Sequence, residues 1–183
     1  MKIKLAIGFL LLVNLIIFSS CQSDKKAATE LPNIVIIFTD DQGYEDLSSF
    51  GSETISTPNI DQLAENGMKF TDFHVAASVY TTGNTGLNPA EQTIAEILKK
   101  KGYRTAMAGK WHLGHMKKFL PLQHGFDQYF GIPYSNDMSK GELPLIRGNE
   151  VVETEPDQSL LTKRYTEFCV DFIDKKSNKT PFF

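Results

Sequence analysis

The sequence predicts an α/β domain in which helices cover a parallel sheet, and three observations lead to this fold class. Strand-like and helix-like segments alternate along residues 33–108, the order expected when right-handed crossovers join parallel strands. The first strand-like segment, "NIVIIF", is continuously apolar, which is typical of a strand buried on both faces. The 183 residues are 41% hydrophobic and 22% charged, which is the composition of a globular protein with a length that suggests one domain.

The first 21 residues have a different pattern. "MKIKLAIGFLLLVNLIIFSSC" carries Lys2 and Lys4, a mostly apolar run from Leu5 to Phe18, and then two serines before Cys21. This arrangement is typical of a secretory signal peptide rather than of a spanning helix. Small residues directly before a cysteine resemble the lipobox of bacterial lipoproteins, although an ordinary cleavage site near Cys21 is the alternative.

Residues 22–31 are expected to form a polar tether between this signal and a domain that covers residues 32–183. If Cys21 carries acyl chains, the protein is exported and held at a membrane, in the periplasm or at the cell surface. A net charge of −3 provides no positive field for a polyanion, so nucleic acid is not an expected partner.

The first expected helix lies in "STPNIDQLAENG", between the strand "NIVIIF" and a second strand, "MKFTDFHVA". Thr57 is the expected N-cap, Pro58 the first helical residue and Gly67 the stop. Its expected buried face consists of Ile60, Leu63 and Ala64.

The second expected helix lies in "NPAEQTIAEILKKKG", with Asn88 as cap, Pro89 at its start and Gly102 at its end. Its buried face would consist of Ile94, Ile97 and Leu98. A strand at Tyr103–Ala108 follows. From Gly109 to about Pro156 the chain is rich in glycine, proline and aromatic residues, and we expect a long ordered excursion over the strand ends.

A last helix is expected over Ser159–Lys175, with another strand beginning at Phe182 where the sequence stops. Cys169 lies beside the apolar stripe of this helix, and we interpret it as a core residue rather than a reactive thiol. The stripe consists of Leu161, Tyr165, Phe168 and Phe172.

Two polar clusters follow expected strands, where ligands collect in parallel α/β sheets. Asp40 and Asp41 follow "NIVIIFT", and two adjacent carboxylates suit a divalent cation with hard oxygen ligands; a solvated acidic turn or helix cap is the alternative. Lys110 and His112, in "GKWHLGH", follow "YRTAMA". In an extended segment their side chains would share one side and could hold an anion and donate a proton to a leaving oxygen; two surface residues of a glycine-rich loop are the alternative.

These segments resemble a known family. "NIVIIFTDDQGYEDLSSFGSETISTPNIDQLAENGMKFTDFHVAAS", "GLNPAEQTIAEILKKKGYRTAMAGKWHLGH" and "HGFDQYFGIPYSNDM" are similar to the N-terminal part of the type I sulfatases, of the arylsulfatase kind. The resemblance covers about residues 32–183. It implies the fold of the alkaline phosphatase superfamily, an α/β sheet sandwiched by helices, here incomplete. A phosphoesterase of that superfamily is the less favoured alternative, because GKWHLG is more characteristic of sulfatases.

The resemblance also implies roles for the two polar clusters. Asp40 and Asp41 match the first pair of ligands to the active-site calcium of the family. Lys110 and His112 match the pair that contacts the sulfate and assists departure of the alcohol. The implied activity is that of a sulfuric ester hydrolase acting on sulfated carbohydrate or aryl sulfate esters.

The nucleophile of the family is missing from this sequence. Sulfatases carry a Cys or Ser within C-x-P-S-R that is oxidised to formylglycine, whose hydrate attacks sulfur. Here "VAASV" is followed by Tyr80, Thr81, Thr82 and Gly83, so a gap near residues 80–84 removes the motif and the helix after it. The downstream half of the calcium site and the smaller C-terminal subdomain are also expected to be missing. Three interpretations follow: an inactive sulfatase chain, a non-catalytic remnant or binding protein, or an incomplete gene model of an active enzyme.

Overall fold

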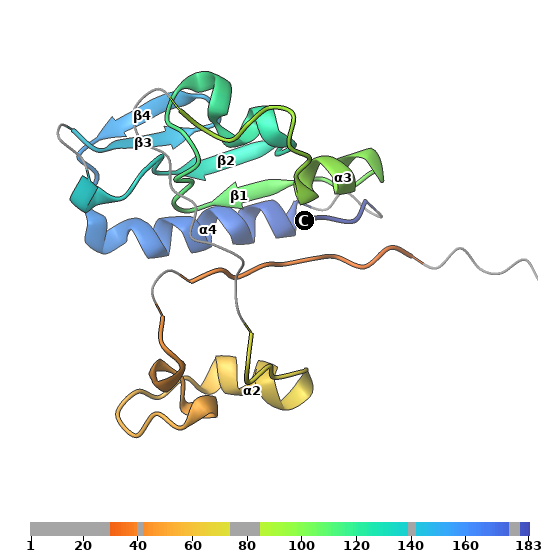
Figure 1. Cartoon of the computed structure of the whole chain (residues 1–183), viewed down its shortest axis with the longest axis vertical. Helices are drawn as coiled ribbons and strands as arrows, with labels where there is room; N and C mark the ends of the chain where they lie inside the picture. Colours follow the sequence, from red (N-terminus) through yellow and green to blue (C-terminus); the bar gives the residue numbers. More distant parts are fainter. Residues whose placement is uncertain (1–29, 40–41, 74–84, 139–141, 176–179) are drawn as a thin grey trace, which may run out of the picture. The chain divides into compact units, whose positions relative to one another are not determined.

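The computed structural model describes residues 30–39, 42–73, 85–138, 142–175 and 180–183 (Figure 1). The chain divides into two compact units, Met1–Leu31 and Pro32–Phe183, and every helix and strand named below belongs to the second. No helix in the described ranges is long and apolar enough to cross a membrane. The predicted signal peptide, the tether up to residue 29 and Cys21 lie outside the described residues.

The centre of the second unit is a four-stranded mixed sheet in the order β1-β2-β3-β4 (Figure 1). β1 and β2 are parallel, whereas the pairs β2·β3 and β3·β4 are antiparallel. The strands are β1 (Ala106–Ala108), β2 (Gln128–Gly131), β3 (Pro144–Arg147) and β4 (Glu150–Thr154). Helices together with a sheet that contains a parallel pair confirm the predicted α/β class.

The region from Gly109 to Pro156 is more regular than the sequence indicated. We expected a long ordered excursion over the strand ends, but three of the four strands lie there. These strands are only four or five residues long and are joined by turns such as the one at Gly148 (φ +64°), so no extended apolar alternation marks them in the sequence. Their conformation depends on hydrogen bonds to the neighbouring strands of the sheet.

The last residues of the chain lie parallel to β1, as predicted for a strand beginning at Phe182. Arg104 and Phe182 form a parallel bridge, the Arg104 N–H donates to the Pro181 carbonyl at 2.9 Å, and the Ala106 N–H donates to the Phe183 carbonyl at 2.8 Å. The Arg104 guanidinium also lies 4.6 Å from the ring centroid of Phe172. These contacts attach the end of the chain to the sheet.

The prediction of a buried strand at "NIVIIF" was wrong for the described part of this segment. Ile34 donates its N–H to the Phe182 carbonyl at 2.8 Å, but residues 33–39 are not a strand, and Val35 and Phe38 are 62% and 83% exposed. A strand that is apolar on both faces needs a neighbour on each edge and a layer on each side. In the described structure the bonds of this segment to the chain end come from its first two residues, with the Asn33 side chain accepting from the Phe182 N–H at 3.1 Å and the Ile34 N–H donating to the Phe182 carbonyl.

Helix α4 (Leu161–Asp174) covers one face of the sheet (Figure 1), as the apolar stripe predicted. Leu161 and Phe168 pack with Phe130 and Leu145 in the larger core cluster, and Tyr165 packs partly buried against it. Cys169 is exposed, so its interpretation as a core residue was wrong. Each helical residue turns about 100° from the previous one, which carries residue 169 away from the buried face.

Helix α3 (Ile94–Lys100) begins later than predicted. Its N-cap is Thr93, which forms a capping box with Glu96, whereas Asn88 accepts a hydrogen bond from the Ala90 N–H at 3.0 Å within a turn. The shift changes the buried face, so Ala95 is buried while Ile94 and Ile97 are exposed. A Thr-x-x-Glu box satisfies two helix-end donors at once, which explains why it prevails over the Asn-Pro signal.

Helix α2 (Pro58–Asn66) starts and stops where the sequence predicted. The Thr57 hydroxyl donates to Asp61 at 3.0 Å, and Ser48 donates to the same carboxylate at 2.6 Å. The predicted buried face was wrong for two of its residues, because Ile60 and Leu63 are 41% and 65% exposed. The strand predicted at "MKFTDFHVA" is not formed over residues 68–73, and its last three residues lie outside the described ranges.

Candidate active site

The segment that follows β1 continues the parallel pairing with the end of β2. The N–H groups of Gly109 and Trp111 donate to the carbonyls of Phe130 and Ile132, each at 3.0 Å. The His112 N–H then donates to the Pro133 carbonyl at 3.1 Å. Lys110 and His112 therefore lie just beyond the carboxyl ends of two parallel strands, which is where ligands bind in α/β folds.

Lys110 and His112 are both partly buried, and the residue between them is an anchor. Trp111 is 9% exposed, packs with Leu120 and Tyr129 and donates its indole N–H to the Phe119 carbonyl at 2.7 Å. The sequence motifs alone did not indicate a role for Trp111. A lone apolar residue between two polar ones was the signal that could have indicated it.

His112 has a left-handed backbone, with φ at +56°. This conformation is uncommon for any residue other than glycine, although histidine adopts it more often than most, and it costs about 1–3 kcal/mol. The left-handed residue lies at the last hydrogen bond of the parallel pair and turns the chain away from β2. The i, i+2 spacing of Lys110 and His112 was interpreted for a uniformly extended segment, and the backbone at His112 departs from that. A backbone outlier at a strand end supports a functional role for His112.

Glycine packing makes this turn possible. A Cβ atom on Gly131 would overlap the carbonyl oxygen of Gly109, so β2 approaches the turn more closely than any side chain permits. The Tyr129 hydroxyl donates to the Ile132 carbonyl at 2.9 Å beneath the same turn. Desolvation raises the pKa of the Tyr129 phenol above its ordinary value, so this hydroxyl stays a neutral donor.

The residues that follow the predicted gap lie against the site segment. The Leu87 N–H donates to the Leu113 carbonyl at 2.8 Å. Gly86 and Gly114 are packed so tightly around Phe119 that a Cβ on either would overlap its side chain. The chain therefore brings residues 86–87 beside "GKWHLGH". Tyr80, in the predicted gap, lies outside the described residues.

Asp40 and Asp41 lie outside the described ranges. Within those ranges there is no group of three or more His, Cys, Asp or Glu side chains that could hold a metal ion. The described residues alone therefore do not fit a calcium ion, which takes about six to eight oxygen ligands.

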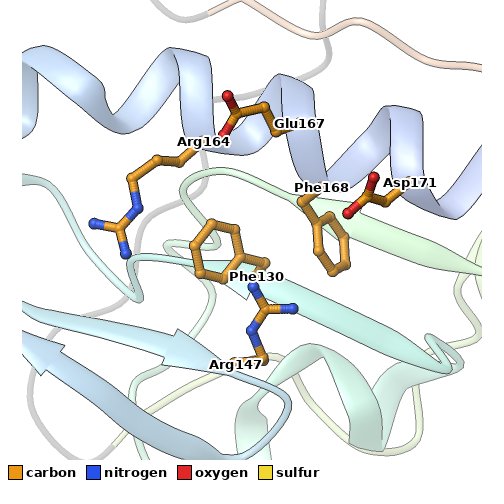
Figure 2. A pocket seen from close by; sticks show the side chains of 6 residues that line it. All are labelled: Phe130, Arg147, Arg164, Glu167, Phe168 and Asp171. Atoms are coloured by element: carbon orange, nitrogen blue, oxygen red, sulfur yellow. The ribbon is translucent and has the colours of Figure 1, made fainter.

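A separate pocket of about 180 Å³ lies between α4 and the sheet, and Figure 2 shows the side chains that line it. Arg164 beside it is bound to Glu153 at 2.7 Å, and the Arg147 guanidinium lies 4.6 Å from the Phe130 ring centroid. The pocket is smaller than most ligand sites, and a local ion pair and a cation–π contact already engage both arginines. Its lining residues are Phe130, Arg147, Arg164, Glu167, Phe168 and Asp171.

Comparison with known proteins identifies the family. The family model described as Sulfatase matches residues 32–183. The chain belongs to the sulfatase family. The sulfatase resemblance drawn from the sequence motifs is thereby confirmed.

This sulfatase chain is similar to curated arylsulfatases. It is 36% identical to arylsulfatase G of Mus musculus over 206 residues, covering 83% of this chain and 39% of the relative. It is also 36% identical to arylsulfatase A of Homo sapiens, covering 86% of this chain and 40% of the relative. The sulfatase chain thus spans about two fifths of the length of these relatives.

Solved structures agree with the fold. The crystal structure of Ps i-CgsB matches 83% of this sulfatase chain and 43% of its own, with a TM-score of 0.71 and 29% identity. The PsFucS1 sulfatase from Pseudoalteromonas sp. matches 82% of this chain and 42% of its own, with a TM-score of 0.66 at 23% identity. The alkaline-phosphatase-like α/β fold expected from the sequence is confirmed for the part that the chain covers.

Proposed function

We propose that this chain carries the sulfate-contacting part of a sulfuric ester hydrolase, with Lys110 and His112 as the contacting residues. The Lys110 ammonium would bind the sulfate group, and the His112 imidazole would donate a proton to the leaving alcohol oxygen. The observation that supports this most is the position of both residues beyond the paired ends of β1 and β2, in a chain whose family is the sulfatases.

The proposed substrates are sulfated carbohydrates or aryl sulfates. The family name supports the sulfate ester, and the curated relatives named arylsulfatase support the aryl sulfate. A structure of Ps i-CgsB in complex with k-i-k-neocarrahexaose matches this chain at 29% identity and a TM-score of 0.69, which supports the carbohydrate. The sulfate is the shared chemistry that Lys110 would recognise.

We further propose that this chain, as written, does not complete the reaction. The family needs the aldehyde hydrate of formylglycine, and Tyr80 stands where its precursor belongs. A phenol side chain is not a substrate for that oxidation, so no hydrate is available to attack sulfur. The match with mouse arylsulfatase G also supports an internal gap, because it runs over 206 residues while 83% of 183 residues is about 152.

Calcium binding by this chain is proposed to be weak. Asp40 and Asp41 would contribute two carboxylates, and the described residues contain no group of three or more acidic, histidine or cysteine side chains to complete the shell. Lys110 and His112 are therefore expected to contact sulfate without help from a tightly held cation. Millimolar calcium should leave the melting temperature of the purified chain unchanged within error, and a large rise would contradict this.

Two assays of the purified chain test the proposal. Hydrolysis of a chromogenic aryl sulfate should stay at the buffer rate, and turnover that Lys110→Ala or His112→Ala abolishes would show the chain to be active. Binding of the same aryl sulfate, measured by calorimetry, should weaken by about 10- to 150-fold in Lys110→Ala, since a charge-assisted contact is worth about 1.5–3 kcal/mol. The matched control is Lys117→Ala, whose ammonium is exposed and paired with Glu150 at 3.3 Å. Equal binding by the wild type and Lys110→Ala would remove Lys110 from the site.

The proposed gap at Tyr80 allows two alternatives to an inactive sulfatase. In a binding protein of the sulfatase fold, aryl sulfate binding persists without turnover. In an incomplete gene model, DNA sequencing across codons 79–84 would reveal an intact C-x-P-S-R frame. An intact C-x-P-S-R frame would mean that the complete gene encodes an active sulfatase. Binding without turnover would leave sulfate binding as the remaining activity of the chain.

The location of the protein is also a proposal. The signal-like residues 1–21 support export, and Cys21 would carry the lipid that holds the chain in the periplasm or at the cell surface. Labelling cells with radioactive palmitate should mark the wild type and leave Cys21→Ser unmarked. Labelling of both would exclude Cys21 as the lipidated residue.

A further inference from the structure

His124 is a buried histidine for which the sequence offered no role. It ends the 3-10 turn Pro121–His124, and only 1% of its surface is exposed. Its Nε2 atom is buried without a hydrogen-bond partner in the part of the chain that the structure describes. A polar atom in this state is destabilising, so the presence of histidine rather than an apolar residue calls for an explanation.

The ring of His124 packs on Trp111, the anchor of the candidate site. The two ring centroids are 5.9 Å apart and the planes are inclined by 26°, which is a stacked arrangement. Phe126 contacts Trp111 edge-on, with ring centroids 6.3 Å apart and an angle of 85° between the ring planes. Trp111 lies between Lys110 and His112 in the sequence, so whatever holds the indole also holds the turn that presents them.

The surroundings favour a neutral imidazole. Burial lowers the pKa of His124 below its ordinary 6.5, while the charge of Glu96 acts in the opposite direction. Glu96 is the charged group that faces it from helix α3, and Thr93 of the same helix start donates its hydroxyl to the His124 carbonyl at 2.8 Å. Lys110 and His112 flank Trp111 in the segment stacked on the ring, and Tyr129 packs with Trp111 in the same buried cluster.

We propose that His124 is a positioning residue, whose neutral ring holds Trp111 in place and whose protonation releases Trp111 and loosens the turn carrying Lys110 and His112. A cationic imidazole needs water or a carboxylate, and the stacked, buried position offers neither at Nε2. Acid therefore shifts the ring outward, and the indole loses its packing surface. The consequence for sulfate contact rests on the proposed function, whereas the positioning of Trp111 is independent of it.

Fluorescence tests the proposal directly because Trp111 is the single tryptophan of the chain. The emission of the full chain is recorded while the pH is lowered from about 8 to about 4.5, the range in which histidines titrate. The expected result is a red shift of the emission maximum with a midpoint below 6.5, lost in His124→Phe, which keeps an aromatic ring without a titrating group. A wild type without a transition, or a His124→Phe variant that keeps it, would overturn the proposal.

Two controls separate His124 from its neighbours. His112→Gln and His115→Gln should both keep the transition, and its loss in either variant would assign the titration to that residue and refute the role of His124. If His124→Phe does not fold, the wild type alone decides by nuclear magnetic resonance. One of the four histidine ring signals should then titrate with the same midpoint as the Trp111 indole N–H, and the absence of such a pair would refute the proposal.

The outcome also distinguishes this inference from the proposed function. If aryl sulfate binding fails while the fluorescence transition persists, the sulfate site is wrong and the positioning of Trp111 stands. If aryl sulfate binds but the fluorescence transition is absent, the sulfate site stands and the role of His124 in positioning Trp111 is wrong. If both hold, aryl sulfate affinity should fall with the same midpoint as the emission shift.

Discussion

Gly131→Ala tests the close approach that supports the candidate site. The new Cβ would overlap the carbonyl of Gly109, so β2 and the turn after β1 must move apart. Three backbone hydrogen bonds join them at this point, from Gly109, Trp111 and His112. At about 1 kcal/mol for each net hydrogen bond, we expect the free energy of unfolding to fall by about 3 kcal/mol.

Urea unfolding of the full chain at low concentration, followed by Trp111 emission, measures this loss. With a slope of about 2 kcal/mol per molar urea, the midpoint should fall by about 1.5 M. The matched control is Gly102→Ala, where a Cβ meets no atom within 4 Å but the residue has φ at +88°. Left-handed strain alone costs about 1–2 kcal/mol, and Gly102→Ala should leave the native Trp111 emission unchanged.

The comparison between the two variants can refute this reasoning. If Gly131→Ala costs no more than Gly102→Ala and leaves the native emission of Trp111 unchanged, the two segments do not approach as closely as the structure indicates. The geometric support for Lys110 and His112 at the strand ends would then be lost. A large loss for Gly131→Ala with altered emission supports the close approach.

Three further predictions concern the helix cap, the pH dependence and the exposed apolar segment. Thr93→Ala removes the capping box and should reduce the unfolding free energy by about 1 kcal/mol, whereas Thr166→Ala, on an exposed part of α4, should change it little. Desolvation raises the pKa of Asp127, but hydrogen bonds from Lys99 and Thr105 outweigh it, and the net pKa lies below the ordinary 3.8. The stabilisation is present above pH 3.8 and lost as the pH falls through the folded-state pKa, so Asp127→Asn should flatten the acid limb of the thermal stability curve. Ile37 is 78% exposed in an unpaired apolar segment, so we expect the chain to associate, and Ile37→Lys should reduce its mass in light scattering; a monomeric wild type with a cooperative melt would contradict this.

Local signals in the sequence predicted elements whose determinants lie within a few residues. Pro58 and Gly67 delimit α2 as expected, and the apolar stripe of α4 faces the core. Where two local signals competed, the predicted helix start was wrong. Asn88-Pro89 was taken as a helix start, although the Thr93 capping box begins α3. Both signals are local, and the capping box prevails because it satisfies two helix-end donors at once.

Burial was the least predictable property. "NIVIIF" has the composition of a strand buried on both faces, yet Val35 and Phe38 are exposed, because burial depends on neighbours that a segment does not contain. The short strands β2, β3 and β4 were missed for the same reason. They pair with one another and carry little local pattern of their own.

By itself, the sequence determined the sulfatase family and the positions of Lys110 and His112 after a strand, and it is the basis of the proposed gap near Tyr80. These depend on which residues follow one another in the chain. Only the tertiary structure decided that Gly131 supports the turn, that Trp111 anchors it and that His124 packs on Trp111. These contacts join residues at least eight positions apart, so no local pattern in the sequence specifies them.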